Sequence, residues 1–141
     1  MLNAKGVGSV SSVLGALDWL MQMAPAYNVR VVNMSLGMPA INSYKFDPLC
    51  VAVRKLVDKG VVVVAAAGNN GKTSAGQKIY GQIHAPGNEP SALTVGAVDT
   101  HGTDTRLDDT VATYSSRGPT RSFWTDAVSY THLTLPTICS V

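Results

Sequence analysis

The sequence predicts an α/β fold, a partial doubly wound parallel sheet, from two observations. First, apolar repeats of helical spacing, beginning near Val10 and Pro48, alternate with the apolar segments 29–36 and 61–67. This order is typical of neighbouring parallel strands joined by a helical crossover. Second, Val61–Val64 are four consecutive β-branched residues, and such a run predicts a central strand buried on both faces.

The first helix is expected over Val10–Met21, where apolar residues recur every three or four positions. A serine, Ser9 or Ser11, is suited to cap its amino terminus, and Pro25 lies just beyond its end. The apolar, β-branched segment 29–36 then follows as the first strand.

The second helix is expected over residues 48–59. Asp47 is a typical N-cap residue, and Pro48 suits the first helical position because its missing N–H would have no partner there. Gly60 fits the C-terminal cap. Since the next strand, 61–67, begins directly afterwards, the connection between helix and strand is short.

The rest of the chain is more polar. Residues 69–88 are rich in Gly, Asn and Lys and are expected to form one long loop, a kind of segment that is often functional. Short strands are expected over 93–98 and 111–115, with a polar turn over 99–109 between them.

Composition excludes several classes of protein. The net charge is +2 and no cluster of Lys or Arg occurs, so we expect no nucleic-acid partner. The apolar run 61–67 is far too short to span a membrane. Two cysteines, Cys50 and Cys139, do not define a disulfide framework.

Four segments, in the same order and at the same spacing, resemble the subtilisin-like serine proteases, the subtilases. They are VVNMSLG at 31–37, AAAGN at 65–69, APGN at 85–88 with LTVGAV at 93–98, and YSSRGP at 114–119. The resemblance implies a subtilisin-like fold. It also implies that the complete parent protein hydrolyses peptide bonds of polypeptide substrates through an acyl-enzyme.

The resemblance gives roles to the residues at the ends of the two central strands. Asn69 would be the side-chain donor of the oxyanion hole, the alternative being a turn residue that tolerates left-handed geometry. The first strand would pair with the substrate backbone, and the second would form a wall of the primary pocket. The substrate-binding residues so implied are Ser35, Leu36 and Gly37, then Ala66, Ala67 and Gly68. Met38 stands where the family often has Gly, which would narrow or redirect the pocket.

The catalytic Asp, His and Ser are not found. His101 belongs to an HGT sequence, but it follows a strand in a polar turn, so a catalytic role is rejected. Ser35 lacks the preceding Gly of a nucleophile elbow, and Asp18 lies on the polar side of the first helix. His84 is interpreted as a loop histidine, with a pocket-lining role as the alternative. We therefore expect residues 1–127 to lie between the catalytic His and Ser segments, and to be inactive alone.

The carboxyl-terminal residues differ in character. Residues 128–141 contain no charged side chain, and 128–137 resemble the in-frame translation of a transposase adapter used in sequencing libraries. We expect these residues to be a non-native tail. The family habit implies secretion, although no signal segment is visible in this chain.

No cofactor is required for the implied chemistry, and no metal site is assigned. Many subtilases bind calcium, so a structural calcium ion in the parent is implied by the resemblance alone. The acidic turn of Asp104, Asp108 and Asp109 is interpreted as solvated surface.

Two alternative functions are distinguished from a protease by sequence signals. A pseudoprotease would keep the peptide-binding groove and lack the triad, and flanking DTG-, HGTH- and GTSMA-like motifs would distinguish it from an enzyme. A nucleotide-binding α/β domain is disfavoured because no G-x-G-x-x-G or G-x-x-x-x-G-K-[ST] sequence follows any strand.

Overall fold

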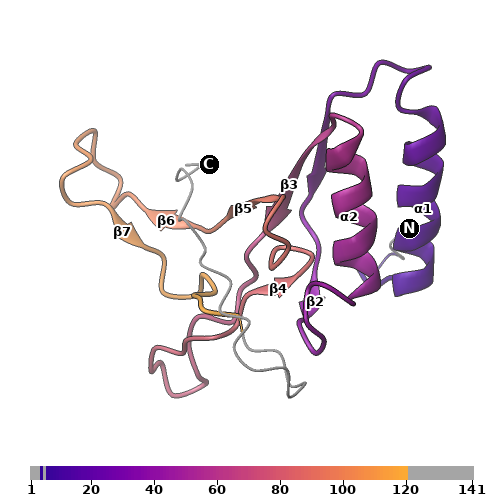
Figure 1. Ribbon diagram of the computed structural model, residues 1–141. Coiled ribbons are helices and arrows are strands. Elements are labelled where there is room, and N and C mark those ends of the chain that lie inside the picture. The colour runs from indigo at the N-terminus through magenta and orange to yellow at the C-terminus, as the bar shows by residue number, and fades with distance from the viewer. Residues whose placement is uncertain (1–3, 5, 121–141) are drawn as a thin grey trace.

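The computed structural model describes residue 4 and residues 6–120 (Figure 1). The predicted tail, 128–141, lies outside them. The elements are α1 (Val10–Met23), β1 (Val31–Met34), β2 (Met38–Pro39), α2 (Pro48–Asp58), β3 (Val62–Ala66), β4 (His84–Ala85), β5 (Leu93–Val95), β6 (Val98–Asp99) and β7 (Thr110–Val111).

The central feature is a three-stranded parallel sheet in the order β1–β3–β5. Val31 pairs with Val62 and Met34 pairs with Ala65, so β1 and β3 run in register side by side. Helix α2 connects these two strands along the chain, and α1 lies beside α2 (Figure 1). The predicted α/β fold and the adjacent parallel strands joined through a helix are confirmed.

Both helices begin at the predicted caps. Ser9 Oγ accepts a hydrogen bond from the backbone N–H of Ser12 at 3.1 Å, so Ser9, and not Ser11, is the N-cap of α1. Asp47 Oδ1 accepts one from the backbone N–H of Leu49 at 2.9 Å. Such bonds satisfy N–H groups that have no partner within the helix.

Gly60 ends α2 in a Schellman turn. Its φ of +85° is readily adopted only without a side chain. The N–H of Gly60 donates to the carbonyl of Val57 at 2.8 Å, and the N–H of Val61 donates to the carbonyl of Leu56 at 3.2 Å. This turn connects α2 directly to β3.

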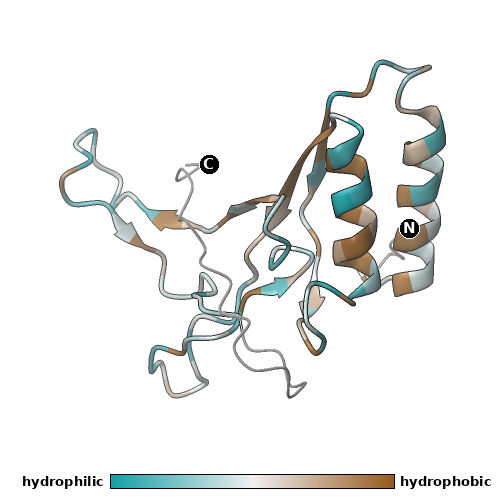
Figure 2. Cartoon of the chain, viewed as in Figure 1, coloured by the Kyte–Doolittle hydropathy of each residue, from teal (hydrophilic) through white to brown (hydrophobic). Residues whose placement is uncertain are grey.

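The main core lies between the helices and one face of the sheet. Its buried members are Val13, Leu17, Ala24, Met34, Leu49, Val53, Leu56, Val61 and Val63. Figure 2 shows β3 as hydrophobic along its length. The alternation of buried and exposed residues along β3 means that every second side chain faces the helices.

The opposite face of the sheet is more open than expected. Val31, Val62 and Leu93 are 59%, 44% and 48% exposed, and they are neighbours or near neighbours in the register. The prediction that β3 is buried on both faces is therefore wrong for the described residues. The physical reason is that α1 and α2 both pack on the same face (Figure 1).

The segments after β3 are more structured, and more divided, than predicted. Residues 69–88 are not one continuous loop, because β4 lies within them and pairs antiparallel with β2. The expected strand 93–98 is two strands: β5 belongs to the parallel sheet, whereas β6 forms a hairpin with β7. Gly96 separates them, and a side chain there would meet Ser115 Oγ at 2.8 Å.

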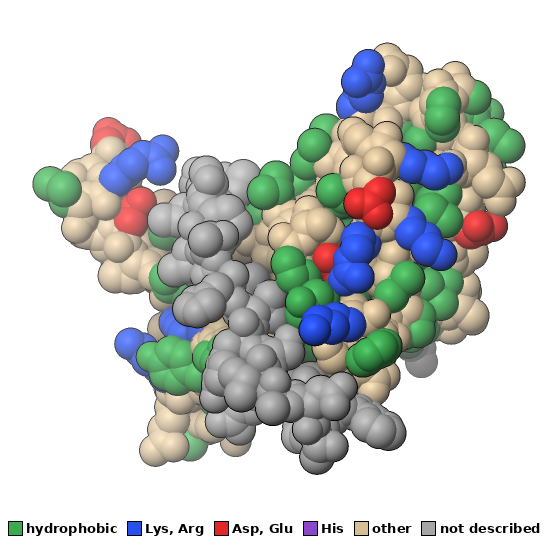
Figure 3. All heavy atoms as spheres, viewed as in Figure 1, with side chains coloured by type: hydrophobic (Ala, Val, Ile, Leu, Met, Phe, Trp, Pro, Cys, Tyr) green, Lys and Arg blue, Asp and Glu red, His purple; other side chains and the backbone are tan. Residues whose placement is uncertain are grey.

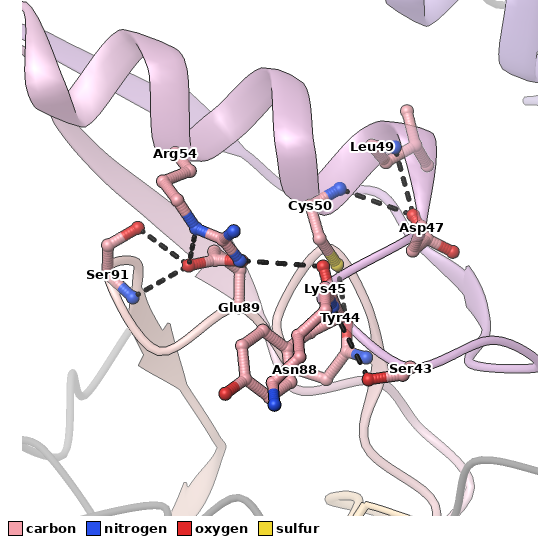
Figure 4. A network of polar contacts seen from close by, with 10 residues as sticks. All are labelled: Ser43, Tyr44, Lys45, Asp47, Leu49, Cys50, Arg54, Asn88, Glu89 and Ser91. Carbon is pink, nitrogen blue, oxygen red and sulfur yellow. Dashed lines mark hydrogen bonds and ion pairs between the residues drawn. The ribbon is translucent and has the colours of Figure 1, made fainter. Parts of the chain in front are cut away.

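A buried ion pair fastens the segment after β4 to α2 (Figure 4). Arg54 Nε donates to Glu89 Oε1 at 3.1 Å, and the Ser91 hydroxyl donates to the same oxygen at 2.9 Å. The Glu89 side chain is 1% exposed, so without these donors its charge would carry a large desolvation cost.

The thiol of Cys50 adds a second link by donating to Asn88 Oδ1 at 3.1 Å. Burial raises the pKa of this thiol well above its ordinary value, and the nearby carboxylates of Asp47 and Glu89 raise it further. Cys50 therefore stays protonated at neutral pH, which suits a structural rather than a nucleophilic role.

The surface shows no single-sign patch on the face in Figure 3, where Lys and Arg side chains are interspersed with acidic and hydrophobic groups. Within the described residues, neither helix has the length and apolar character needed to cross a bilayer.

Candidate functional site

The predicted substrate-binding residues come together at the carboxyl ends of β1 and β3. The β1–β3 ladder ends at the pair Met34 and Ala65, and Ser35 and Ala66 follow directly after these two residues. Ser35 and Gly37 are exposed, while Leu36 is half-buried and packs against the core. In parallel α/β sheets this is the edge at which ligands bind.

The chain leaves β3 through a left-handed turn at Gly68, whose φ is +104°. The carbonyl of Gly68 accepts a hydrogen bond from the N–H of Ser116 at 2.9 Å. The hydroxyl of Ser116 in turn accepts from the N–H of Asn70 at 3.0 Å. Ser116 therefore holds the backbone on both sides of Asn69.

Asn69 is exposed at the tip of this turn. Among the described residues, none forms a hydrogen bond with its side-chain amide. The backbone on either side of Asn69 is therefore held in place, while its side-chain amide is open to solvent.

The far end of the turn is held by a close backbone approach at Gly71. Its N–H donates to the carbonyl of Tyr114 at 2.9 Å, and its carbonyl accepts from Arg117 Nη1 at 3.1 Å. A methyl group at Gly71 would overlap the backbone carbonyl of Ser115. Sequence reasoning missed this support, although the adjacent serines of the YSSRGP segment were the available signal.

His84 contacts both predicted substrate segments. A methyl group on Gly68 would lie 2.9 Å from His84 Cγ, and one on Gly37 would lie 3.0 Å from His84 Cβ. Its backbone N–H donates to the carbonyl of Ala67 at 3.0 Å, and its Nε2 lies 2.9 Å from Asn70 Nδ2. The interpretation as a loop histidine is therefore wrong, because His84 is part of β4.

The stability of the fold should depend on the titration of His84. Burial lowers the pKa of its imidazole below the ordinary value. The unfolded chain therefore binds a proton first as the pH falls below about 6.5, so the free energy of unfolding should decrease from there down to the folded-state pKa. Urea unfolding between pH 7.5 and 5 should show this slope, and His84→Gln should reduce it. An equal slope in the variant would contradict the prediction.

The residues rejected as triad members are engaged elsewhere. The hydroxyl of Ser35 accepts a hydrogen bond from Asn33 Nδ2 at 3.0 Å, and Asp18 Oδ2 accepts one from Gln22 Nε2 on α1 at 2.9 Å. His101 lies in the β6–β7 hairpin, with Nδ1 3.7 Å from Asp99 Oδ1. None of these contacts forms a nucleophile–base pair within residues 6–120.

The acidic turn between β6 and β7 forms local hydrogen bonds. Calcium takes six to eight oxygen ligands. Both carboxylate oxygens of Asp108 accept from Thr103 Oγ1, at 3.0 and 2.9 Å. In the part of the chain that the structure describes, no group of three or more His, Cys, Asp or Glu side chains is placed to hold a metal ion.

A parallel sheet with both helices on one face and a sharp turn at Gly68 after β3 agrees with a partial α/β fold of the subtilisin type. The family model described as Subtilase family matches residues 1–135. The chain therefore belongs to the subtilase family.

Curated and solved relatives agree with this assignment. The chain is 37% identical over 125 residues to serine protease AprX of Bacillus subtilis (strain 168), covering 85% of this chain and 27% of AprX. It is 37% identical over 99 residues to Subtilisin Savinase of Lederbergia lenta, covering 70% of this chain and 31% of that protein. The structure of Sphericase aligns with a TM-score of 0.67 at 33% identity, covering 84% of this chain and 34% of Sphericase. The chain thus spans about a third or less of these relatives.

Proposed function

We propose that the complete protein carrying this chain is a serine endopeptidase that hydrolyses polypeptides through an acyl-enzyme. This chain supplies the substrate edge and one oxyanion donor. The Asn69 amide donates to the carbonyl oxygen as it becomes negatively charged. The backbone of Ser35–Gly37 pairs with the extended substrate, and Ala66–Gly68 form one wall of the primary pocket.

One observation carries the proposal. The side-chain amide of Asn69 is exposed and forms no hydrogen bond with the described residues, and it lies in a turn that Ser116 holds at the end of β3. Ser116 holds the backbone of Gly68 and Asn70, so Asn69 needs little reorganisation to meet an oxyanion. A turn residue with only a structural role would be expected to use its side chain locally, and Asn69 makes no such bond among the described residues.

The proposed mechanism is tested on the complete protein. A serine-directed fluorophosphonate should label one residue stoichiometrically and abolish peptide hydrolysis, and an activated ester should give a burst of product as the acyl-enzyme accumulates. Peptide binding without labelling or hydrolysis would instead indicate a pseudoprotease.

The 141-residue chain by itself should hydrolyse no peptide or ester above background. It supplies the proposed oxyanion donor, but among residues 6–120 no serine is hydrogen-bonded to a histidine. Rates measured with the purified chain should equal those of the Asn69→Ala chain. A rate that disappears specifically in the Asn69→Ala chain would contradict this expectation.

The complete protein is also proposed to be secreted, in keeping with the protease relatives that it resembles. Fractionation of cells that express the complete gene should place the protein in the culture medium. Retention of the folded protein within the cells would contradict this localisation without affecting the proposed chemistry.

A further inference from the structure

His84 lies in space that two glycines leave open. Its Cγ lies 2.9 Å from the position that a side chain at Gly68 would occupy, and its Cβ lies 3.0 Å from the corresponding position at Gly37. Gly37 follows β1 and Gly68 follows β3, and the two glycines belong to the two segments that the proposed function assigns to the substrate. The imidazole is therefore positioned to contact a substrate side chain that enters beside them.

The hydrogen bond to Asn70 sets the orientation of the ring's polar atoms. Asn70 Nδ2 donates to His84 Nε2 at 2.9 Å, so Nε2 is the acceptor. A neutral imidazole carries one N–H, which then lies on Nδ1. Nδ1 is 3.0 Å from a methyl position on Gly68 and 3.4 Å from one on Gly37. The ring thus presents an N–H beside both segments.

This N–H has no acceptor within the part of the chain that is described. The His84 side chain is half-buried, so its polar atoms are partly shielded from water. Nδ1 is not among the fully buried atoms without a partner, so water reaches it, and an acceptor oxygen of a substrate could replace that water. The imidazole ring also occupies space. It should therefore disfavour a large apolar side chain of the substrate, which would need that space.

We propose that His84 determines specificity by selecting a substrate side chain with an acceptor oxygen, such as that of Gln or Asn, over a large apolar one. The selected side chain belongs to the substrate residue that contributes the scissile carbonyl. Asn70 is a positioning residue, because its amide keeps Nε2 occupied and Nδ1 free to donate. The inference rests on the proposed function, since it takes Ser35–Gly37 and Ala66–Gly68 as the substrate-binding segments.

The test uses the complete protein and peptides that differ only at that one residue, which is Asn, Gln, Leu or Phe. The ratio of kcat/KM for Gln to that for Leu should favour Gln. His84→Leu keeps much of the bulk but removes the donor, so this ratio should fall about 10-fold, the usual effect of one hydrogen bond. His84→Gly removes the bulk, so kcat/KM for the Phe peptide should rise about 10-fold or more.

Two control variants separate the effect of His84 from general damage. His84→Gln retains an N–H donor and should keep the preference for acceptor oxygens. His101→Asn removes an imidazole from the β6–β7 hairpin, at a φ of +51° that Asn tolerates, and should leave the ratio unchanged. Circular dichroism would confirm that each variant is folded.

The outcomes distinguish this inference from the proposed function. A wild-type protein that prefers Leu or Phe to Gln would overturn the inference without recourse to any variant. Hydrolysis with the same preference in wild type and in a folded His84→Leu variant would also overturn it, and would leave the proposed function standing. Failure to hydrolyse any of the peptides, together with no fluorophosphonate labelling, would overturn the proposed function and the inference with it.

Discussion

Replacing Asn69 with Ala in the complete protein is expected to lower kcat by about 10²–10³-fold, roughly 2.7–4 kcal/mol, a magnitude taken from the oxyanion donor of a subtilisin and so carried over from a relative. The amide should bond the oxyanion more strongly than the ground-state carbonyl, so its loss falls mainly on the transition state. KM should therefore change little. Steady-state kinetics with one peptide substrate would measure both constants.

A second asparagine provides the control. Asn42 lies in the segment between β2 and α2 and belongs to neither proposed substrate segment, so Asn42→Ala should leave kcat within about twofold. An Asn69→Ala enzyme with unchanged turnover would show that Asn69 is only a turn residue. A rise in KM with constant kcat would instead assign it to ground-state binding of the substrate.

The largest stability effect is expected at Gly71. An alanine methyl group there would overlap the carbonyl of Ser115, which is backbone and cannot turn away as a side chain would. The turn and the 114–117 segment would have to separate. We expect Gly71→Ala to lower the free energy of unfolding by more than about 4 kcal/mol. Single substitutions cause losses of this size only through severe defects such as overpacking. Urea denaturation followed by far-ultraviolet circular dichroism would measure it.

Gly15 is a matched control with the opposite expected sign. It lies in α1, is exposed, and has no atom within 4 Å of an added methyl group. Since alanine favours helices more than glycine does, Gly15→Ala should raise the free energy of unfolding by about 0.5–1 kcal/mol. Similar values for Gly15→Ala and Gly71→Ala would mean that the close approach to Ser115 does not contribute to stability.

The layer of helices and parallel strands was predictable because its signals are local. Asp47 and Pro48 mark the start of α2, Gly60 marks its end, and the run of valines that follows forms β3. Each signal acts within a few residues, so the chain order alone leads to parallel neighbours. The exposure of Val62 could not be read from the same run, because it depends on which face both helices cover.

The polar edge of the fold was less predictable because its contacts are distant in sequence. Ser116 reaches Asn70 across 46 positions, and Glu89 reaches Arg54 across 35. The short strands β2 and β4 pair over only two residues each, too few for an alternating pattern to appear. The family resemblance supplied roles for Asn69 and its neighbours and a pocket-lining alternative for His84, but it did not give the contacts of His84 with the Gly37 and Gly68 positions.

The hydrogen bond between Asn70 and Ser116 joins residues that are 46 positions apart, and this separation affects the order of folding during synthesis on the ribosome. The layer from α1 to β3 ends at residue 66, whereas the serine that braces the turn is residue 116, 50 positions later (116 minus 66). At translation rates of about 5–20 residues per second, that interval lasts about 3–10 s. We expect the helices and the first two parallel strands to collapse in this time, while the Asn69 turn remains without support. The proposed oxyanion donor, Asn69, should thus be among the last of the described residues to gain its final geometry.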